Sequence, residues 1–163
     1  MKTQIPALET IEDFLAQKRI AMVGVSRNPK DFSAELFEEF RKRGYDMVPV
    51  NPNAHEVLGQ PCFAHVQEIQ PPVHAALLMT TGEVTDAVVS DCAAAGIRRV
   101  WMYRAAGKGA VTEKAVAFCR EHGIDVVPGQ CPFMFLPGAG GVHKFHGFIR
   151  KIFGGYPKHH HAA

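Results

Sequence analysis

A loop of small, polar and basic residues follows the first apolar run of the chain. Residues 20–33 read IAMVGVSRNPKDFS, with hydroxyl groups at Ser26 and Ser33 and cations at Arg27 and Lys30. Where such a loop joins a buried strand to a helix, backbone N–H groups and the positive end of the helix dipole can hold a phosphate. The sequence therefore predicts a phosphate-bearing ligand. The candidate contact residues in this loop are Gly24, Val25, Ser26, Arg27, Asn28, Lys30 and Ser33.

Two further loops carry candidate ligand contacts. Val50, Asn51 and Pro52 form a rigid, neutral turn, because proline lacks an N–H and restrains the residue before it. Thr80 and Thr81 precede a helical pattern. Their hydroxyl groups either meet the ligand or cap the helix.

Three of the candidate residues can also be explained without a ligand. Cys131 follows the last apolar run, and it either lines a ligand channel or is a buried apolar thiol. Arg27 and Lys30 either bind phosphate or are solvated loop charges. The sequence leaves both alternatives open.

Apolar runs with strand character alternate with helical patterns along the chain. The expected strands are 20–25, 45–50, 73–79, 99–103 and 124–127, and the expected helices are 11–18, 33–43, 83–95 and 111–122. This alternation is typical of a parallel sheet with helices on both faces. The sequence predicts an α/β, Rossmann-like, doubly wound parallel sheet of five strands in the order 3-2-1-4-5, numbered along the chain.

Two regions are expected along the chain. Residues 1–137 form the Rossmann-like domain, and residues 138–163 form a C-terminal extension with a basic helix at 142–153 and a flexible tail. In the extension, His143 and His146 share a helix face. With Cys131 they could form a metal site, but the basic residues around them are more typical of a solvated surface. No metal site is therefore assigned.

Composition limits the function classes. The 163 residues are 47% hydrophobic, 21% charged and carry a formal net charge of +2, which gives no basic footprint for nucleic acid. We find no signal peptide and no run of about 20 apolar residues, so a membrane partner is not expected and the protein is expected in the cytoplasm. The four cysteines lie far apart without a CxxC pair. Free thiols in a reducing compartment fit this spacing.

The first loop departs from the best-known nucleotide fingerprints. An NAD site needs G-x-G-x-x-G after the first strand and an acidic residue at the end of the second. Ser26 stands at the second glycine position, and Asn51 and Pro52 close the second strand without a carboxylate. The phosphate loop G-x-x-x-x-G-K-[ST] is also absent from the sequence. Because the features of an NAD site are missing, an NAD(P)-dependent oxidoreductase ranks only as the second hypothesis for the function.

Three segments together carry a family resemblance. They are GVSRNPKDFSAE after the first strand, PVNPN after the second, and Cys131 after the fifth. The chain resembles, over roughly residues 14–131, the small stand-alone CoA-binding proteins, which are similar to the CoA-binding domain of the succinyl-CoA synthetase α-subunit. The resemblance implies that CoA or an acyl-CoA lies across the carboxyl ends of the strands. Its phosphates would lie on the first loop and its adenine end near the loops after the second and third strands.

The residues agree with this implied pose. Loop N–H groups, hydroxyl groups and the two cations could neutralise a diphosphate and a 3′-phosphate, each charge-assisted contact contributing roughly 1.5–3 kcal/mol. A carboxylate in place of Asn51 would repel a 3′-phosphorylated ribose. Under oxidation, Cys131 could form a mixed disulfide with CoA.

No catalytic set accompanies these residues. The sequence shows no recognisable Ser/His/Asp or Cys/His arrangement. We therefore expect binding of CoA or an acyl-CoA without catalysis, as a carrier, sensor or regulatory module. A third hypothesis is a protein-interaction module with a vacant Rossmann pocket and an unidentified protein partner.

Overall fold

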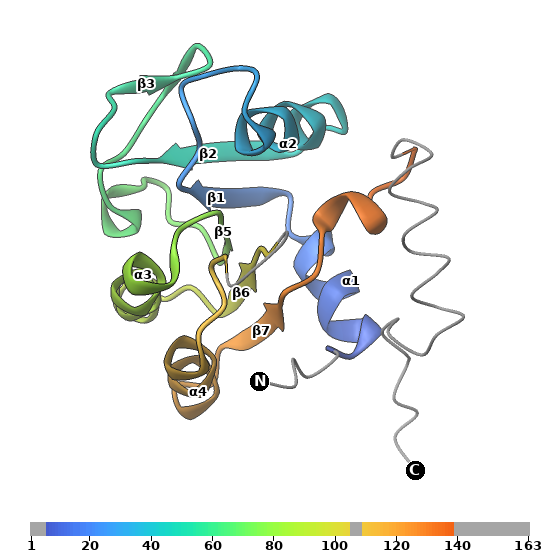
Figure 1. The fold of residues 1–163 in the computed structure, drawn as a ribbon, viewed down its shortest axis with the longest axis vertical. Coiled ribbons are helices and arrows are strands. Elements are labelled where there is room, and N and C mark those ends of the chain that lie inside the picture. The colour runs from blue at the N-terminus through green and yellow to red at the C-terminus, as the bar shows by residue number, and fades with distance from the viewer. Residues whose placement is uncertain (1–5, 105–108, 139–163) are drawn as a thin grey trace.

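Five parallel strands form the central sheet of the computed structural model, which describes residues 6–104 and 109–138 (Figure 1). The strand order is β2-β1-β5-β6-β7. In that order the strands are Asp46–Val50, Arg19–Val23, Ala75–Leu78, Arg99–Met102 and Asp125–Pro128. The helices are α1 Leu8–Ala16, α2 Phe32–Lys42, α3 Gly82–Ala94 and α4 Glu113–Glu121. The predicted fold class is confirmed.

Smaller elements complete the described chain. An antiparallel pair, β3 (Glu56–Val57) and β4 (Gln60–Pro61), lies outside the main sheet. Two short 3-10 helices are η1 (Val66–Glu68) and η2 (Pro132–Met134). The expected basic helix at 142–153 lies outside the described residues, as do His143 and His146.

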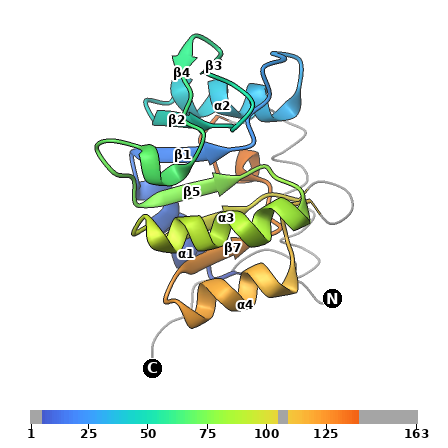
Figure 2. The ribbon, with the colours of Figure 1, turned by 90° about the vertical axis from the view of Figure 1, so that its left-hand side faces the viewer.

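Helices cover the sheet on both faces, with α3 and α4 together on one face (Figure 2). In β1, Ala21 and Val23 join the core cluster that includes residues of α3 and α4. The alternate residues Ile20 and Met22 join the cluster that includes residues of α1 and α2. Because successive side chains of a strand point to opposite faces, a strand covered twice must be apolar throughout. This explains the continuous apolar runs in the sequence.

Trp101 anchors the core on the α1 side. Its side chain is fully buried, and its ring lies edge-on to Phe14 at 5.3 Å and to Phe135 at 5.9 Å between centroids. Its Nε1–H donates to the backbone carbonyl of Gln130 at 2.9 Å. A buried indole N–H needs such a partner, and here the partner follows β7. The hydrogen bond therefore ties the segment after β7 to β6.

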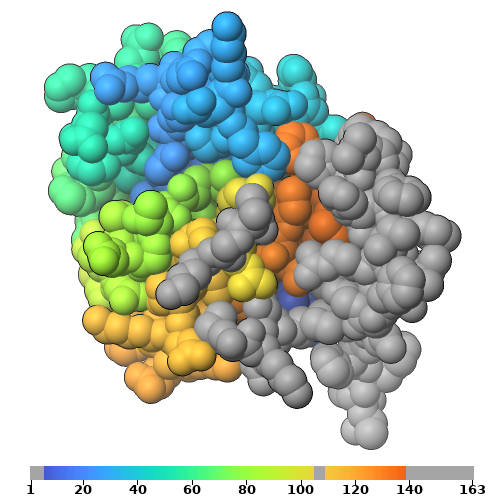
Figure 3. All heavy atoms as spheres, viewed as in Figure 1, coloured from blue at the N-terminus to red at the C-terminus, as the bar shows by residue number. Residues whose placement is uncertain are grey.

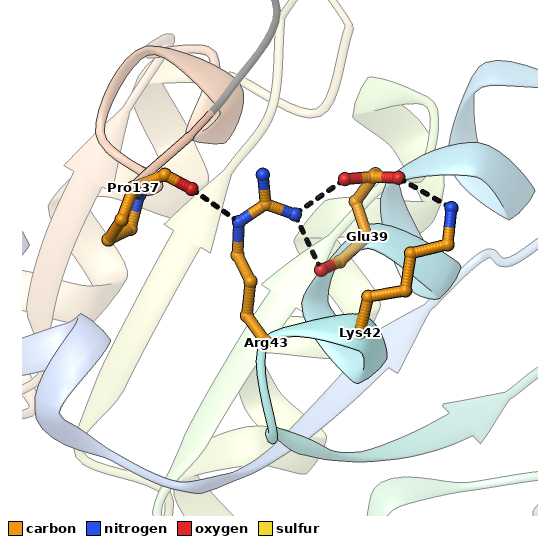
Figure 4. Close-up of polar contacts among 4 residues, drawn as sticks. All are labelled: Glu39, Lys42, Arg43 and Pro137. Atoms are coloured by element: carbon orange, nitrogen blue, oxygen red, sulfur yellow. Dashed lines mark hydrogen bonds and ion pairs between the residues drawn. The ribbon is translucent and has the colours of Figure 1, made fainter.

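A polar cluster fastens the end of this segment to α2 (Figure 4). Arg43 donates through Nε to the Pro137 carbonyl at 2.7 Å and through Nη1 to the Glu39 carbonyl at 2.9 Å. Hydrogen bonds from Lys42 and Arg43 lower the pKa of the Glu39 carboxyl group. Arg43 thus links residues 94 positions apart in the chain.

The strand order is a correction to the prediction. The predicted order 3-2-1-4-5 places strand 45–50 inside the sheet, between strands 73–79 and 20–25. In the structure β5 pairs with β1 on one side and β6 on the other, whereas β2 pairs in the main sheet with β1 alone. Proline cannot donate to a ladder, so Pro49 suits an edge strand. The outer side of β2 instead meets Phe63, whose N–H donates to the Pro49 carbonyl at 3.1 Å.

Candidate functional site

A slot of about 360 Å³ opens beyond the carboxyl ends of β1 and β2. One wall comes from α3 and the other from residues 50–53 and 64–66, with Gly24 and Thr80 between them in the lining. The slot adjoins the boundary between β1 and β5, where the winding of the sheet reverses. In doubly wound folds, ligands bind at this position.

Gly24 allows the loop after β1 to approach the loop after β5. Its φ of 88° is in the left-handed region, and an added Cβ would lie 3.1 Å from both the carbonyl carbon and oxygen of Met79. Its N–H donates to the Val50 carbonyl at 2.9 Å, and the Met79 N–H donates to the Val23 carbonyl at 2.8 Å. Glycine is therefore required by backbone conformation and by space at this point of the slot.

Asn51 connects the loop after β2 to the loop after β1. Its side-chain amide donates to the Val25 carbonyl at 3.2 Å, and its Oδ1 accepts from the Asn53 N–H at 2.9 Å. Val50 is buried, whereas Pro52 is exposed at the slot. The predicted neutral turn is thus present in the slot lining, with an amide where NAD-binding folds carry an acid.

The loop at 26–33 is closed by its own side chains. Ser33 Oγ accepts from the Ser26 N–H at 3.0 Å, Ser26 Oγ accepts from the Asn28 N–H at 3.1 Å, and Asn28 Oδ1 accepts from the Lys30 N–H at 3.1 Å. Three N–H groups of the loop, those of Ser26, Asn28 and Lys30, therefore have internal partners. A ligand that uses them must displace these hydroxyl and amide groups.

Asp31 adds a negative charge to this loop and was not among the predicted site residues. Its carboxylate accepts from Ser26 Oγ at 2.6 Å and from the Asn28 side-chain amide at 3.0 Å. Its side chain does not cap α2, so the first N–H groups of that helix donate no hydrogen bond to this carboxylate. Arg27 and Lys30 are exposed in the same loop.

Thr80 and Thr81 have different positions. Thr80 lines the slot, and its hydroxyl lies 2.6 Å from the hydroxyl of the fully buried Thr85. Thr85 in turn donates to the Thr81 carbonyl at 3.0 Å. Thr81 is the N-cap residue of α3 by position, but its side chain makes no capping hydrogen bond, and it is not in the slot lining.

Cys131 lies at a second location on the carboxyl edge, beside Tyr103. Burial and then the nearby Cys131 raise the pKa of the Tyr103 hydroxyl to about 12. Phe32, at the start of α2, stacks on Tyr103 at 5.0 Å between centroids and meets Phe133 edge-on at 5.5 Å. Cys131 itself is half-buried and packs against the core cluster of α1 and α2.

Apart from Thr81, which lies outside the slot lining, the predicted residues fall into three groups. The slot lining includes Gly24, Val50, Asn51, Pro52 and Thr80. The loop leading into α2 holds Val25, Ser26, Arg27, Asn28, Lys30 and Ser33. In the space-filling view the blue residues of this region lie next to the green residues of α3 (Figure 3). Cys131 forms the third group with Tyr103.

Several slot residues were missed from sequence. His65 and Val66 line the slot but were not among the residues predicted to contact a ligand. On α3, Val84 is 49% exposed although it is apolar, and it lines the slot with Asp91. The exposed apolar side chain of Val84 was the one feature that could have pointed to α3 as a wall of the slot.

In residues 6–104 and 109–138, no three His, Cys, Asp or Glu side chains group closely enough to hold a metal ion. No helix in those same ranges has the length and apolar character needed to span a membrane.

Comparison with known proteins places these features in a family. The chain is 29% identical over 129 residues to the uncharacterized protein YneT of Bacillus subtilis, covering 78% of this chain and 93% of that protein. It is 25% identical over 151 residues to acetate–CoA ligase (ADP-forming) II of Archaeoglobus fulgidus, covering 87% of this chain but only 21% of the ligase. This chain therefore matches a small part of that enzyme.

A solved structure agrees with this relationship. A hypothetical protein from Pyrococcus horikoshii superposes with a TM-score of 0.72 at 27% identity, covering 81% of this chain and 94% of that chain. The family model described as a CoA binding domain matches residues 18–137. That range includes every strand of the sheet and every candidate contact residue. The chain belongs to the CoA binding domain family.

Proposed function

We propose that this protein binds CoA or an acyl-CoA and acts as a carrier, sensor or regulatory module without catalysing a reaction on it. One observation carries the proposal: in a chain of the CoA binding domain family, the slot at the reversal point of the sheet is lined by Gly24, Asn51 and Thr80. These residues come from the three loops that the resemblance assigns to the ligand.

The proposed pose uses all three groups of candidate residues. The adenine end occupies the slot, the phosphates lie over the loop at 26–33, and the pantetheine arm extends toward Cys131. Arg27 and Lys30 supply positive charge near the phosphates, and the first turn of α2 supplies backbone N–H groups. Use of the loop N–H groups by phosphate requires their internal hydrogen bonds to break, because the N–H groups of Ser26, Asn28 and Lys30 now donate to side chains of the same loop.

Thermal unfolding with CoA, NAD, NADP and ATP tests this proposal. A ligand at about 100 times its Kd stabilises the folded state by about 2.7 kcal/mol, which raises the Tm of a domain of this size by roughly 5–10 °C. We expect this shift with CoA. A shift with NAD or NADP and none with CoA would replace the proposal by an oxidoreductase, and no shift with any of the four would favour an interaction module.

The position of Cys131 leads to a second prediction. In the proposed pose, its thiolate attacks one sulfur of oxidised CoA, the disulfide breaks, one CoA leaves as a thiolate, and a mixed disulfide remains on the protein. Intact mass should show one CoA adduct on the wild type and none on Cys131→Ala.

The other cysteines provide an internal comparison. Burial raises the pKa of Cys119 to about 12 and raises the pKa of Cys92 further, so little reactive thiolate forms at either residue. Cys62→Ala is the matched control, because Cys62 is also half-buried but lies beside the loop after β2, where its Sγ donates to the Asn51 carbonyl at 3.7 Å, and not at the proposed end of the pantetheine arm. An adduct that persists in Cys131→Ala would contradict the placement of the pantetheine arm.

A further inference from the structure

One face of α3 forms a wall of the slot, and this wall changes from apolar to charged along the helix. Val84, Ala87, Val88 and Asp91 all line it, at the spacing of residues that share a helix face. From Val84 to Asp91 this wall extends about 10 Å, at 1.5 Å per residue. Val84 lies in the first turn of α3, which follows β5 at the carboxyl edge of the sheet, and the loop at 26–33 follows β1 at the same edge. The wall therefore begins apolar near that loop and ends at a carboxylate.

The carboxylate of Asp91 is held by the opposite wall. Gln67 Nε2 donates to its Oδ1 at 2.8 Å, and His65 Nδ1 lies 4.0 Å from its Oδ2. These two residues flank Val66, which is buried and lines the slot. The η1 segment thus fixes one carboxylate oxygen, and the second lies beyond hydrogen-bond distance of the imidazole.

A carboxylate at the end of an apolar wall selects the kind of group that enters. Carboxylate oxygens accept hydrogen bonds, so a flat ring is favoured when its far edge carries an N–H donor. A ring with a carbonyl oxygen at that edge would place two hydrogen-bond acceptors against each other at the half-buried Asp91 carboxylate, and such a mismatch lowers affinity.

We propose that Asp91 accepts a hydrogen bond from the exocyclic amino group of the purine and so determines the choice of base in this slot. This inference rests on the proposed function, because it takes the adenine end of CoA as the slot occupant. Asp91 then discriminates 6-aminopurine from 6-oxopurine. The apolar wall of α3 contributes affinity for either ring.

Isothermal titration with CoA and with its deaminated hypoxanthine analogue tests the proposal. Wild-type protein should bind CoA roughly tenfold or more tightly than the analogue. In Asp91→Asn this ratio should fall toward one or invert, because the new amide can donate to the carbonyl oxygen of the base. The ratio is independent of the fraction of protein that folds, since both ligands are measured on the same preparation.

Asp86→Asn is the matched control. Asp86 is on the same helix and carries the same charge, but it accepts from the Thr112 hydroxyl at the start of α4 and is not in the slot lining. Its variant should keep the wild-type ratio. Equal binding of the two ligands by the wild type, or an unchanged ratio in Asp91→Asn, would overturn the role of Asp91 and leave CoA binding intact. Failure of the wild type to bind either ligand would instead overturn the proposed function.

Discussion

Replacing both Arg27 and Lys30 by alanine should weaken CoA binding about 100-fold or more at low ionic strength. Each charge-assisted contact to phosphate contributes roughly 1.5–3 kcal/mol, and both side chains are exposed in the loop proposed to hold the phosphates. Their removal should leave the Tm without ligand unchanged. Titration calorimetry at two salt concentrations measures the loss, which should shrink as salt screens the contacts.

Two controls test whether the loss of affinity depends on the position and the sign of the charge that is removed. Lys18→Ala combined with Arg98→Ala removes the same charge at the opposite edge of the sheet, before β1 and β6, and should leave the affinity unchanged. Asp31→Asn keeps the shape of its side chain and removes a negative charge from the loop, so it should strengthen CoA binding severalfold. Equal affinity in the Arg27/Lys30 double variant and the wild type would identify both residues as solvated loop charges.

Gly24→Ala should lower the free energy of unfolding by roughly 2–4 kcal/mol. The substitution combines a left-handed backbone conformation, unfavourable for alanine by about 1–2 kcal/mol, with crowding of a Cβ that would lie 3.1 Å from the Met79 carbonyl group. Urea unfolding measures the change.

Gly44 separates these two causes. Its φ of 84° is close to that of Gly24, but an added Cβ would meet nothing within 4 Å. Gly44→Ala should therefore show the conformational loss alone, about 1–2 kcal/mol. Equal losses in the two variants would mean that the loops after β1 and β5 separate easily, contrary to their packing in the structure.

The elements of the fold were predictable because their patterns are local. The strand at 20–25 is apolar on both faces, and the helix at 33–43 repeats its apolar residues with helical spacing and ends at Gly44. The strand order was predicted wrongly, since it depends on which strands pair. Pro49 contained the relevant information, because a residue without an N–H is disfavoured in a strand that is paired on both sides.

The candidate site was predictable where a loop continues directly from a strand. Gly24, Asn51 and Thr80 follow β1, β2 and β5, and parallel strands bring such positions to one edge. The part of the lining at residues 64–66 was not predicted, because His65 belongs to an irregular stretch without periodicity. Asp31 was missed for another reason: its bonds to Ser26 and Asn28 depend on the detailed conformation of the loop.

The single tryptophan of the chain provides an intrinsic fluorescent reporter for one face of the sheet. Trp101 belongs to the same core cluster as Phe133 and Leu136, with Cys131 packed against it, whereas the slot residue Val66 belongs to the cluster on the other face. The emission of Trp101 should therefore respond to a pantetheine arm that reaches Cys131. It should stay constant when a nucleotide alone fills the slot. Titrations with pantetheine and with adenosine 3′,5′-bisphosphate would then distinguish occupancy of the two ends of the site without any attached label.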